Sequence, residues 1–320
     1  MMKLSTMKKM VATLNENWQS PLGEKIMELW EHDPGSLYYV RSSANSVFSF
    51  TRQGVRRYLR FNDECERIRA SIEAEMDVLL YLREQSIRAG QPVKSRNGRY
   101  VEEVPTQWGT FHATVFEAVE GNQIDDEQLT EEQFVAWGRG LGRLHHIFKQ
   151  MPKETSERRP DWRNHLESVR DTVPAEEEAI HRELGLVLHW AESLEQTEDT
   201  YGLIHYDFDM DNQHWVGDDV GVFDFDECAR YWYAADIAFT LKDLWLEGTE
   251  GAHPGIQQFV RGYALETSVD PLLPEQIPWF IRMYELILYA DLYRSVDIDP
   301  TSDHPEWLMG LNCIADASVR

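Results

Sequence analysis

Acidic side chains crowd one stretch of this 320-residue sequence, LIHYDFDMDNQHWVGDDVGVFDFD at residues 203–226. Asp207, Asp209 and Asp211 occupy alternate positions, and Asp224 lies between two phenylalanines. Carboxylates at this density repel one another, so each of them must be solvated or must share a cation. The stretch therefore indicates a cation-dependent chemistry.

The segments around these aspartates predict a loop that leads into a small β-hairpin. YGLI, HWV and GVFDF have the apolar character of strands, and VGDD has the composition of a turn. Such a hairpin would bring Asn212 and Asp224 close together, and amide and carboxylate oxygens are ligands that Mg²⁺ prefers. Asp207, five residues before Asn212, is placed to accept a proton from a hydroxyl nucleophile.

Two other metal chemistries compete with this interpretation. The alternation of Asp207, Asp209 and Asp211 resembles the start of a calcium loop. However, Asn212 replaces the glycine that such a loop needs for its sharp turn, and the flanking segments look like strands instead of helices. A metal-dependent hydrolase built on His205 would need a second histidine at ligand spacing near it, which the sequence does not offer.

A second constellation combines a strand cation with a helix carboxylate. In GVRRYLRF, Arg60 falls on the strand face opposite to Leu59 and Phe61. The helix expected at about residues 64–84 carries an apolar stripe of Ile68, Ile72, Met76, Leu79 and Leu82. Glu75 lies along that stripe, where an unpaired charge is costly, so an ion pair with Arg60 would suit both groups. The alternative is a surface arginine and a partly exposed glutamate.

The wider pattern changes from strands to helices along the chain. Up to residue 121, YYVRSSANSVFSF and GVRRYLRF form a hairpin signal around Gln53 and Gly54, and GRYVEEV and GTFHATVFEAVEG continue the strands. TEEQFVAWGRGLGRLHHIF then predicts an amphipathic helix, with Thr130 and Gln133 at capping-box spacing. Its glycines favour close helix packing, and its two histidines are interpreted as packing or surface residues.

The composition excludes several classes of protein. The 31 basic and 56 acidic residues give a formal net charge of −25, which argues against a nucleic-acid partner or an anionic membrane surface. The cysteines Cys65, Cys228 and Cys313 follow no metal spacing and suggest a reducing compartment. No signal peptide or membrane-spanning segment is evident, so we expect a cytoplasmic protein.

The order of these features resembles the aminoglycoside phosphotransferase and choline kinase family, which has the protein-kinase-like fold. That family carries a histidine–aspartate–asparagine loop, a D-F-D segment and then D-L-A. Here they read HYDFDMDN, FDFDE and ADIAF, and its helix motif reads EMDVLLYL. The resemblance implies an α+β, bilobal fold. An N-terminal antiparallel-sheet lobe would cover residues 1–117, and a larger, mainly helical lobe would cover residues 118–320.

The resemblance also implies roles for individual residues. Asp207 would be the catalytic base, and Asn212 and Asp224 would be the magnesium ligands. Arg60, in place of a lysine, would bind the α- and β-phosphates of the nucleotide, with Glu75 as its partner. Ser43 and Asn45 would lie in a turn over the phosphates. Glu117 and Val119 would bind the adenine. His205 and Asp236 would hold the catalytic loop by hydrogen bonds.

The function implied is that of an ATP- and Mg²⁺-dependent kinase of small molecules. Its partners would be a nucleotide, bound between the lobes, and a small molecule that offers a hydroxyl group as acceptor. A positively charged acceptor would be attracted by the acidic loop. The sequence departs from the family pattern in Arg60, where a lysine is usual, and in Tyr206, where a glycine is usual. These departures motivate the alternative of a pseudokinase that binds nucleotide or a protein partner without turnover. The oligomeric state is left open.

Overall fold

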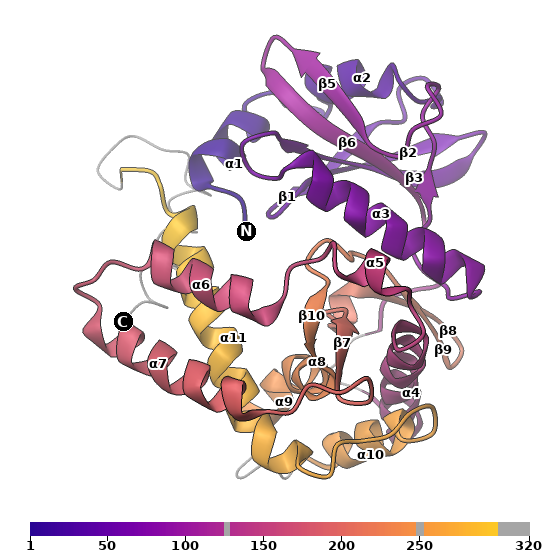
Figure 1. The fold of residues 1–320 in the computed structure, drawn as a ribbon. Coiled ribbons are helices and arrows are strands. Elements are labelled where there is room, and N and C mark those ends of the chain that lie inside the picture. Colours follow the sequence, from indigo (N-terminus) through magenta and orange to yellow (C-terminus); the bar gives the residue numbers. More distant parts are fainter. Residues whose placement is uncertain (125–128, 248–252, 300–320) are drawn as a thin grey trace. The chain divides into compact units, whose positions relative to one another are not determined.

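A computed structural model describes residues 1–124, 129–247 and 253–299, and the chain forms two compact units (Figure 1). Unit 1 consists of residues 1–76, residues 91–118 and the described residues from 288 onward. Unit 2 consists of residues 77–90 and the described part of residues 119–287. The lobe boundary expected between residues 117 and 118 stays a prediction.

Unit 1 is built on an antiparallel sheet with the strand order β1-β2-β3-β6-β4, in which β5 also pairs with β6. Its strands are β1 (Tyr38–Ser42), β2 (Ser46–Arg52), β3 (Val55–Asp63), β4 (Pro92–Val93), β5 (Glu102–Thr106) and β6 (Gly109–Glu117). The turn expected from the sequence joins β2 to β3. Gln53 and Gly54 both have positive φ, at 53° and 78°, which is the backbone that a tight two-residue hairpin turn requires.

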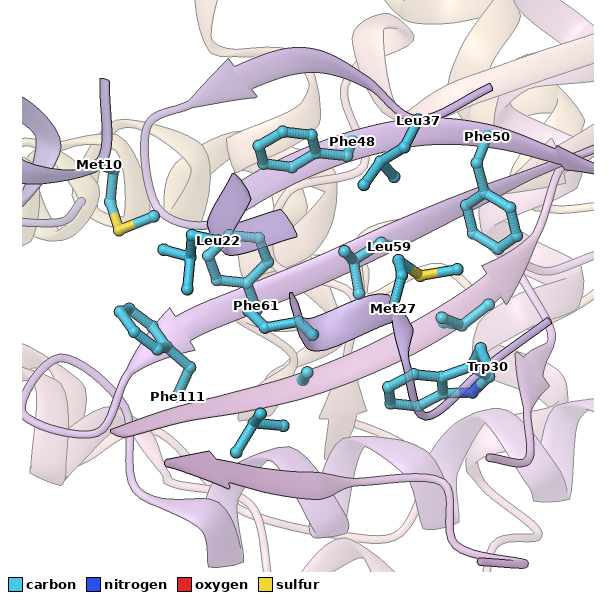
Figure 2. Close-up of a cluster of buried hydrophobic side chains, with 14 residues drawn as sticks. Met10, Leu22, Met27, Trp30, Leu37, Phe48, Phe50, Leu59, Phe61 and Phe111 are labelled. Atoms are coloured by element: carbon cyan, nitrogen blue, oxygen red, sulfur yellow. The ribbon is translucent and has the colours of Figure 1, made fainter. Parts of the chain in front are cut away.

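The apolar core of unit 1 lies on one face of this sheet. Leu59 and Phe61 are two residues apart on β3, so both side chains point to that face. Helix α2 (Pro21–Met27) packs against them through Leu22 and Met27 (Figure 2). Phe48 of β2 stacks on Phe61 with 5.6 Å between ring centroids. Because successive strand residues point to opposite faces, this packing forces Arg60 onto the other face of the sheet.

Helix α3 (Arg69–Glu84) carries the carboxylate that the sequence places inward. Ile72, Met76, Leu79 and Leu82 are buried as expected, and Glu75 is 2% exposed. The prediction was wrong for Ile68, which is 68% exposed. The helix begins at Arg69, later than expected, so Ile68 lies before the first turn and does not share its buried stripe. Residues 69–76 of α3 belong to unit 1 and residues 77–84 to unit 2, and helix α1 (Leu4–Val11) lies wholly in unit 1.

Unit 2 is mainly helical, as expected for this part of the chain. Its helices are α4 (Glu131–Phe148), α5 (Lys153–Ser156), α6 (Trp162–Thr172), α7 (Glu178–Ser193), α8 (Tyr233–Thr240), α9 (Lys242–Glu247) and α10 (Pro254–Tyr263), and α11 (Leu273–Ser295) belongs to it up to Ile287. The predicted capping box between Thr130 and Gln133 starts α4. A Cβ atom at Gly142 of α4 would lie 2.7 Å from the Tyr263 carbonyl oxygen, so this glycine allows the close helix packing that the sequence predicts, and the structure shows that the partner is α10.

Two short strand pairs complete unit 2. β7 (Tyr201–Ile204) pairs with β10 (Ala229–Trp232), and β8 (Gln213–Val216) pairs with β9 (Asp219–Val222). The sequence predicted strand as far as Phe225, whereas β9 ends at Val222. The reason is local, because Asp224 has a φ of 67°, a left-handed conformation that no strand accommodates.

Two further expectations concern features away from the site. Within the described residues, no helix combines the length and the apolar character needed to cross a membrane. In the part of the chain that the structure describes, the exposed Cys65 and the buried Cys228 form no disulfide bond, and Cys313 lies outside that part.

Candidate active site

The loop between β7 and β8 holds the carboxylate that the sequence proposes as a base. Asn212, at the end of a short 3-10 turn (Met210–Asn212), donates its side-chain amide to Asp207 Oδ2 at 2.8 Å and to the Asp207 carbonyl oxygen at 3.1 Å. Both hydrogen bonds join residues of the same short loop, so they do not depend on a residue from another element. The Asp207 carboxylate is therefore held in one orientation by a residue of its own loop.

The electrostatics of Asp207 suit a group that accepts a proton. Burial is the largest influence and the neighbouring carboxylate of Asp209 is the next, and together they raise the pKa of Asp207 to about 7. Lys242 acts in the opposite direction. A base whose pKa lies near neutrality is matched to general-base work at physiological pH.

The hairpin brings the two expected magnesium ligands to one place, as the sequence predicts for the backbone. The Phe223 N–H donates to the Asn212 carbonyl oxygen at 3.0 Å, so Asp224 directly follows a residue bonded to Asn212. The NH₂ group of the Asn212 side chain donates to Asp207, so the side-chain oxygen is the Asn212 side-chain atom that could bind a metal.

This donor set fits Mg²⁺ better than a transition metal or a dedicated calcium cage. Within the described residues, no cluster of three or more His, Cys, Asp or Glu side chains is arranged to hold a metal. One amide oxygen and one carboxylate instead match the way Mg²⁺ binds in kinases, where phosphate oxygens and water supply the other ligands. The flanking elements are strands, so the calcium-loop alternative lacks its helices.

One buried carboxylate holds the backbone of the loop at its start. Asp236 of α8 accepts hydrogen bonds from the N–H groups of His205 and Tyr206, at 2.8 and 2.9 Å. Tyr206 has a φ of 77°, a strained conformation for a residue with a side chain, and the two bonds hold it there. Asp236 therefore has the loop-holding position that the resemblance implies.

A residue that the sequence analysis undervalued completes this anchor. His145 of α4, interpreted as a packing or surface residue, is fully buried and its Nε2 lies 2.8 Å from Asp236 Oδ2. Its Nδ1 lies 2.9 Å from the Tyr263 hydroxyl. Burial is the main cause of its lowered pKa, so it is a neutral partner of Asp236. The sequence contained one usable signal, since His145 follows Leu141 and Leu144 on the apolar face of α4.

Lys242 is a second residue that the sequence analysis missed. Its Nζ lies 2.8 Å from Asp209 Oδ2, and it sits over the ring of Tyr284 at 5.3 Å from the centroid. Asp209 was expected to attract a cationic acceptor, but a cation of the chain itself already occupies that carboxylate.

Tyr206, the residue that replaces a glycine of the family pattern, turns its side chain into an aromatic cluster. Its ring centroid lies 5.4 Å from that of His165, 5.6 Å from that of Tyr231 and 5.1 Å from that of Phe239. The side chain that replaces the glycine is therefore packed among aromatic rings of unit 2.

In unit 1 the structure brings Arg60 and Glu75 together, as the resemblance implies. The Arg60 guanidinium donates to Glu75 Oε2, and both side chains are buried, at 8% and 2% exposure. The surface alternative is therefore wrong. The guanidinium also stacks on the Phe116 ring, with Cζ 4.8 Å from the centroid.

The remaining nucleotide-binding candidates of unit 1 lie at separate places. Ser43 and Asn45 are in the turn between β1 and β2, and the Ser43 N–H donates to the Asn45 carbonyl oxygen at 3.2 Å. The Ser43 side chain is exposed, whereas the Asn45 side chain is buried. Glu117, at the end of β6, has an exposed side chain, and its N–H donates to the Gln91 carbonyl oxygen at 2.9 Å.

Val119 belongs to unit 2. Its carbonyl oxygen is 2.7 Å from His214 Nδ1, so the imidazole occupies one of its two backbone polar groups.

The buried His205 makes the stability of the protein depend on pH. Burial lowers its pKa to about 4 and outweighs the opposing effects of Asp236 and Asp226. Below pH 6.5 the His205 side chain becomes protonated in the unfolded chain but stays neutral in the folded chain. The free energy of unfolding therefore falls as the pH decreases toward 4. Between pH 7 and 5 we expect this residue to account for a loss of about 2 kcal/mol.

Urea unfolding of the parent and of His205→Gln at pH 7 and 5 measures this contribution. The variant should lose about 2 kcal/mol less than the parent over this interval, because all other titrating groups are common to both proteins. Equal pH slopes would show that His205 does not stay neutral in the folded protein.

Comparison with known proteins identifies relatives over most of the chain. A family model described as the phosphotransferase enzyme family matches residues 40–272. The amicoumacin kinase of Bacillus subtilis (strain 168) is 24% identical over 281 residues, which is 85% of this chain and 84% of that protein.

Solved structures show the same fold. An amicoumacin kinase in complex with AMP-PNP, Ca²⁺ and Ami superimposes with a TM-score of 0.78 at 23% identity, over 98% of this chain and 95% of that one. A microcompartment-associated aminopropanol kinase gives a TM-score of 0.69 at 22% identity, over 93% and 94% of the two chains. The predicted α+β, bilobal, protein-kinase-like fold is thereby confirmed.

Proposed function

Because the chain belongs to the phosphotransferase enzyme family, we propose that it transfers the γ-phosphoryl group of ATP·Mg²⁺ to a hydroxyl group of a small acceptor. The observation that carries the proposal is that hydrogen bonds of Asn212 join the loop of Asp207 to the backbone segment that carries Asp224. Asn212 binds Asp207 through its side chain and Phe223 through its backbone, and Asp224 follows at once. A base and two hard-metal ligands are thus held by one loop and one hairpin.

Each group has a distinct part in this proposal. Asp207 orients the acceptor hydroxyl and takes its proton, while Asn212 and Asp224 hold the magnesium ion. When bound, that ion supplies charge neutralisation on the phosphates. In unit 1, Arg60 would bind the nucleotide phosphates, with Glu75 as its partner. The turn at Ser43 and Asn45 would cover those phosphates.

Adenine recognition would use the backbone near the end of β6. Glu117 and the N–H of Val119 are the groups proposed for it, because the Val119 carbonyl oxygen already bonds to His214. Nucleotide and acceptor are the partners that we propose, and the cytoplasm, where ATP is available and cysteines stay reduced, is the compartment.

A screen for acceptor-dependent ADP release tests the function. The purified full chain would be incubated with ATP and Mg²⁺ and with hydroxylated amines, amino alcohols, sugars and aminoglycosides, and phosphorylated products would be identified by ³¹P NMR. Release of ADP that depends on one class of acceptor is the expected result. Failure to bind ATP·Mg²⁺ would refute the proposal, and binding without transfer to any acceptor would favour the pseudokinase alternative.

We further propose that the acceptor carries an amine, as the name of the aminopropanol kinase gives for that relative. Asp207 and Asp209 make the acceptor side of the loop acidic, but Lys242 at 2.8 Å offsets one of the two charges. Lys242 should therefore weaken the preference for a cationic acceptor without abolishing it.

Lys242→Met is expected to increase the preference for an amine. The ratio of kcat/KM for the best amine acceptor to that for its analogue with a hydroxyl in place of the amine should rise roughly five- to tenfold, the scale of one charge interaction of about 1 kcal/mol. Lys242→Arg keeps the charge and is the matched control, with an unchanged ratio. A ratio that stays constant or falls in Lys242→Met would contradict the assigned electrostatic role.

A further inference from the structure

The Arg60 guanidinium contacts a carboxylate and an aromatic ring. Its N–H donates to Glu75 of α3, and its Cζ atom lies over the Phe116 ring, 4.8 Å from the ring centroid. Arg60 is only 7% exposed and Phe116 is half-buried, so the cation–π contact is partly desolvated, which strengthens the attraction between a cation and an aromatic face.

The strand register explains why Phe116 reaches Arg60. In the β3–β6 pair, Arg60 lies opposite Thr114, and Phe116 lies opposite Tyr58. Thr114 and Phe116 share one face of β6, which makes Phe116 the diagonal neighbour of Arg60. Diagonal pairs lie within reach of long and aromatic side chains, so the stack follows from the register of the sheet.

We propose that Phe116 is a positioning residue for ATP, which acts by fixing the plane of the Arg60 guanidinium toward the nucleotide phosphates. This inference rests on the proposed function, which gives Arg60 its phosphate-binding role. Phe116 is not assigned a contact with the transferred group. It acts through Arg60, and it enables an arginine to bind the phosphates at a position where lysine is usual in related kinases.

The physical reason lies in the shape of the two cations. A lysine ammonium is a compact charge whose three donors rotate freely, so it needs only the carboxylate partner to hold it in place. A guanidinium is planar, and its donors form a rigid fork, so rotation of the plane would misdirect every donor together. Glu75 fixes one edge of this fork, and Phe116 fixes the plane.

A two-by-two set of variants tests this inference by equilibrium binding of ATP·Mg²⁺ and of adenosine to the full-length protein. Phe116→Leu should weaken ATP binding by about tenfold, the range of a partly desolvated cation–π contact, and leave adenosine binding unchanged. Phe116→Tyr keeps the ring and should bind ATP like the parent. In an Arg60→Lys background, the same Phe116→Leu change should alter ATP binding by less than about twofold.

Three results would overturn the inference: no loss of ATP affinity in Phe116→Leu, an equal loss for adenosine and ATP, or an equal loss with and without the Arg60→Lys substitution. Equal losses for the two ligands would assign Phe116 to the base instead. Thermal unfolding verifies each variant, and Phe116→Met, which is also apolar and lacks a ring, replaces Phe116→Leu if the latter does not fold. A parent protein that binds no ATP would refute the proposed function itself.

Discussion

Asp207→Asn is expected to lower kcat for acceptor phosphorylation by about three orders of magnitude, toward the upper range for loss of a general base. The amide is nearly isosteric with the carboxylate but cannot take a proton from the acceptor hydroxyl. It can still accept the hydrogen bond that Asn212 donates to Asp207 Oδ2 at 2.8 Å, so the loop should keep its conformation. Steady-state kinetics with the acceptor found in the screen measure the loss.

The controls for this variant separate chemistry from folding and binding. The affinity for ATP·Mg²⁺ and the midpoint of thermal unfolding should remain close to those of the parent. Asp211→Asn is the matched variant, because Asp211 lies in the same loop with its side chain exposed, and it should keep nearly full activity. A fully active Asp207→Asn protein would show that Asp207 has no catalytic role.

Asp224→Asn is expected to weaken magnesium-dependent nucleotide binding by at least about tenfold. The substitution removes one anionic ligand, and even residues that only orient metal ligands cost about 10- to 100-fold in metal affinity or activity when changed. Asparagine is chosen because Asp224 has a φ of 67°, and asparagine tolerates this left-handed conformation better than alanine does. The measurement is a Mg²⁺ titration of ATP binding.

The expected pattern for Asp224→Asn differs from that for Asp207→Asn. Asp224→Asn should shift the Mg²⁺ concentration for half-saturation, whereas Asp207→Asn should leave it near the parent value and reduce turnover. Nucleotide binding measured without divalent metal should be similar in all three proteins. An unchanged Mg²⁺ titration in Asp224→Asn would count against this residue as a ligand.

The candidate site illustrates why some contacts can be predicted from the sequence. The sequence predicts the β8–β9 hairpin and with it the approach of Asn212 to the segment of Asp224, and the Phe223 N–H indeed donates to the Asn212 carbonyl oxygen. The hydrogen bond between Asn212 and Asp207 was not predicted, although it spans only five residues. The β2–β3 turn and the inward position of Glu75 follow in the same way from a residue pair and from helical periodicity. Ile68 marks the limit of such reasoning, because helix ends depend on capping and tertiary contacts that periodicity does not contain.

The other contacts that the sequence analysis missed join residues far apart in the chain. His145 and Asp236 are separated by 91 positions, and Asp209 and Lys242 by 33. A chain with 56 acidic residues offers every cation many plausible partners, so composition and spacing do not single out these pairs. The packing of α4, α8 and α9 selects them.

By itself, the sequence determined most of the elements, the order of the motifs and the hairpin that brings the backbone of Asn212 next to the segment of Asp224, because periodicity and turn chemistry act within a few residues. Only the tertiary structure decided that His145 supports Asp236, that Lys242 covers Asp209 and that Phe116 stacks on Arg60. Those choices depend on which faces of distant elements pack together to bury apolar surface. That outcome is a property of the whole fold and not of any one segment.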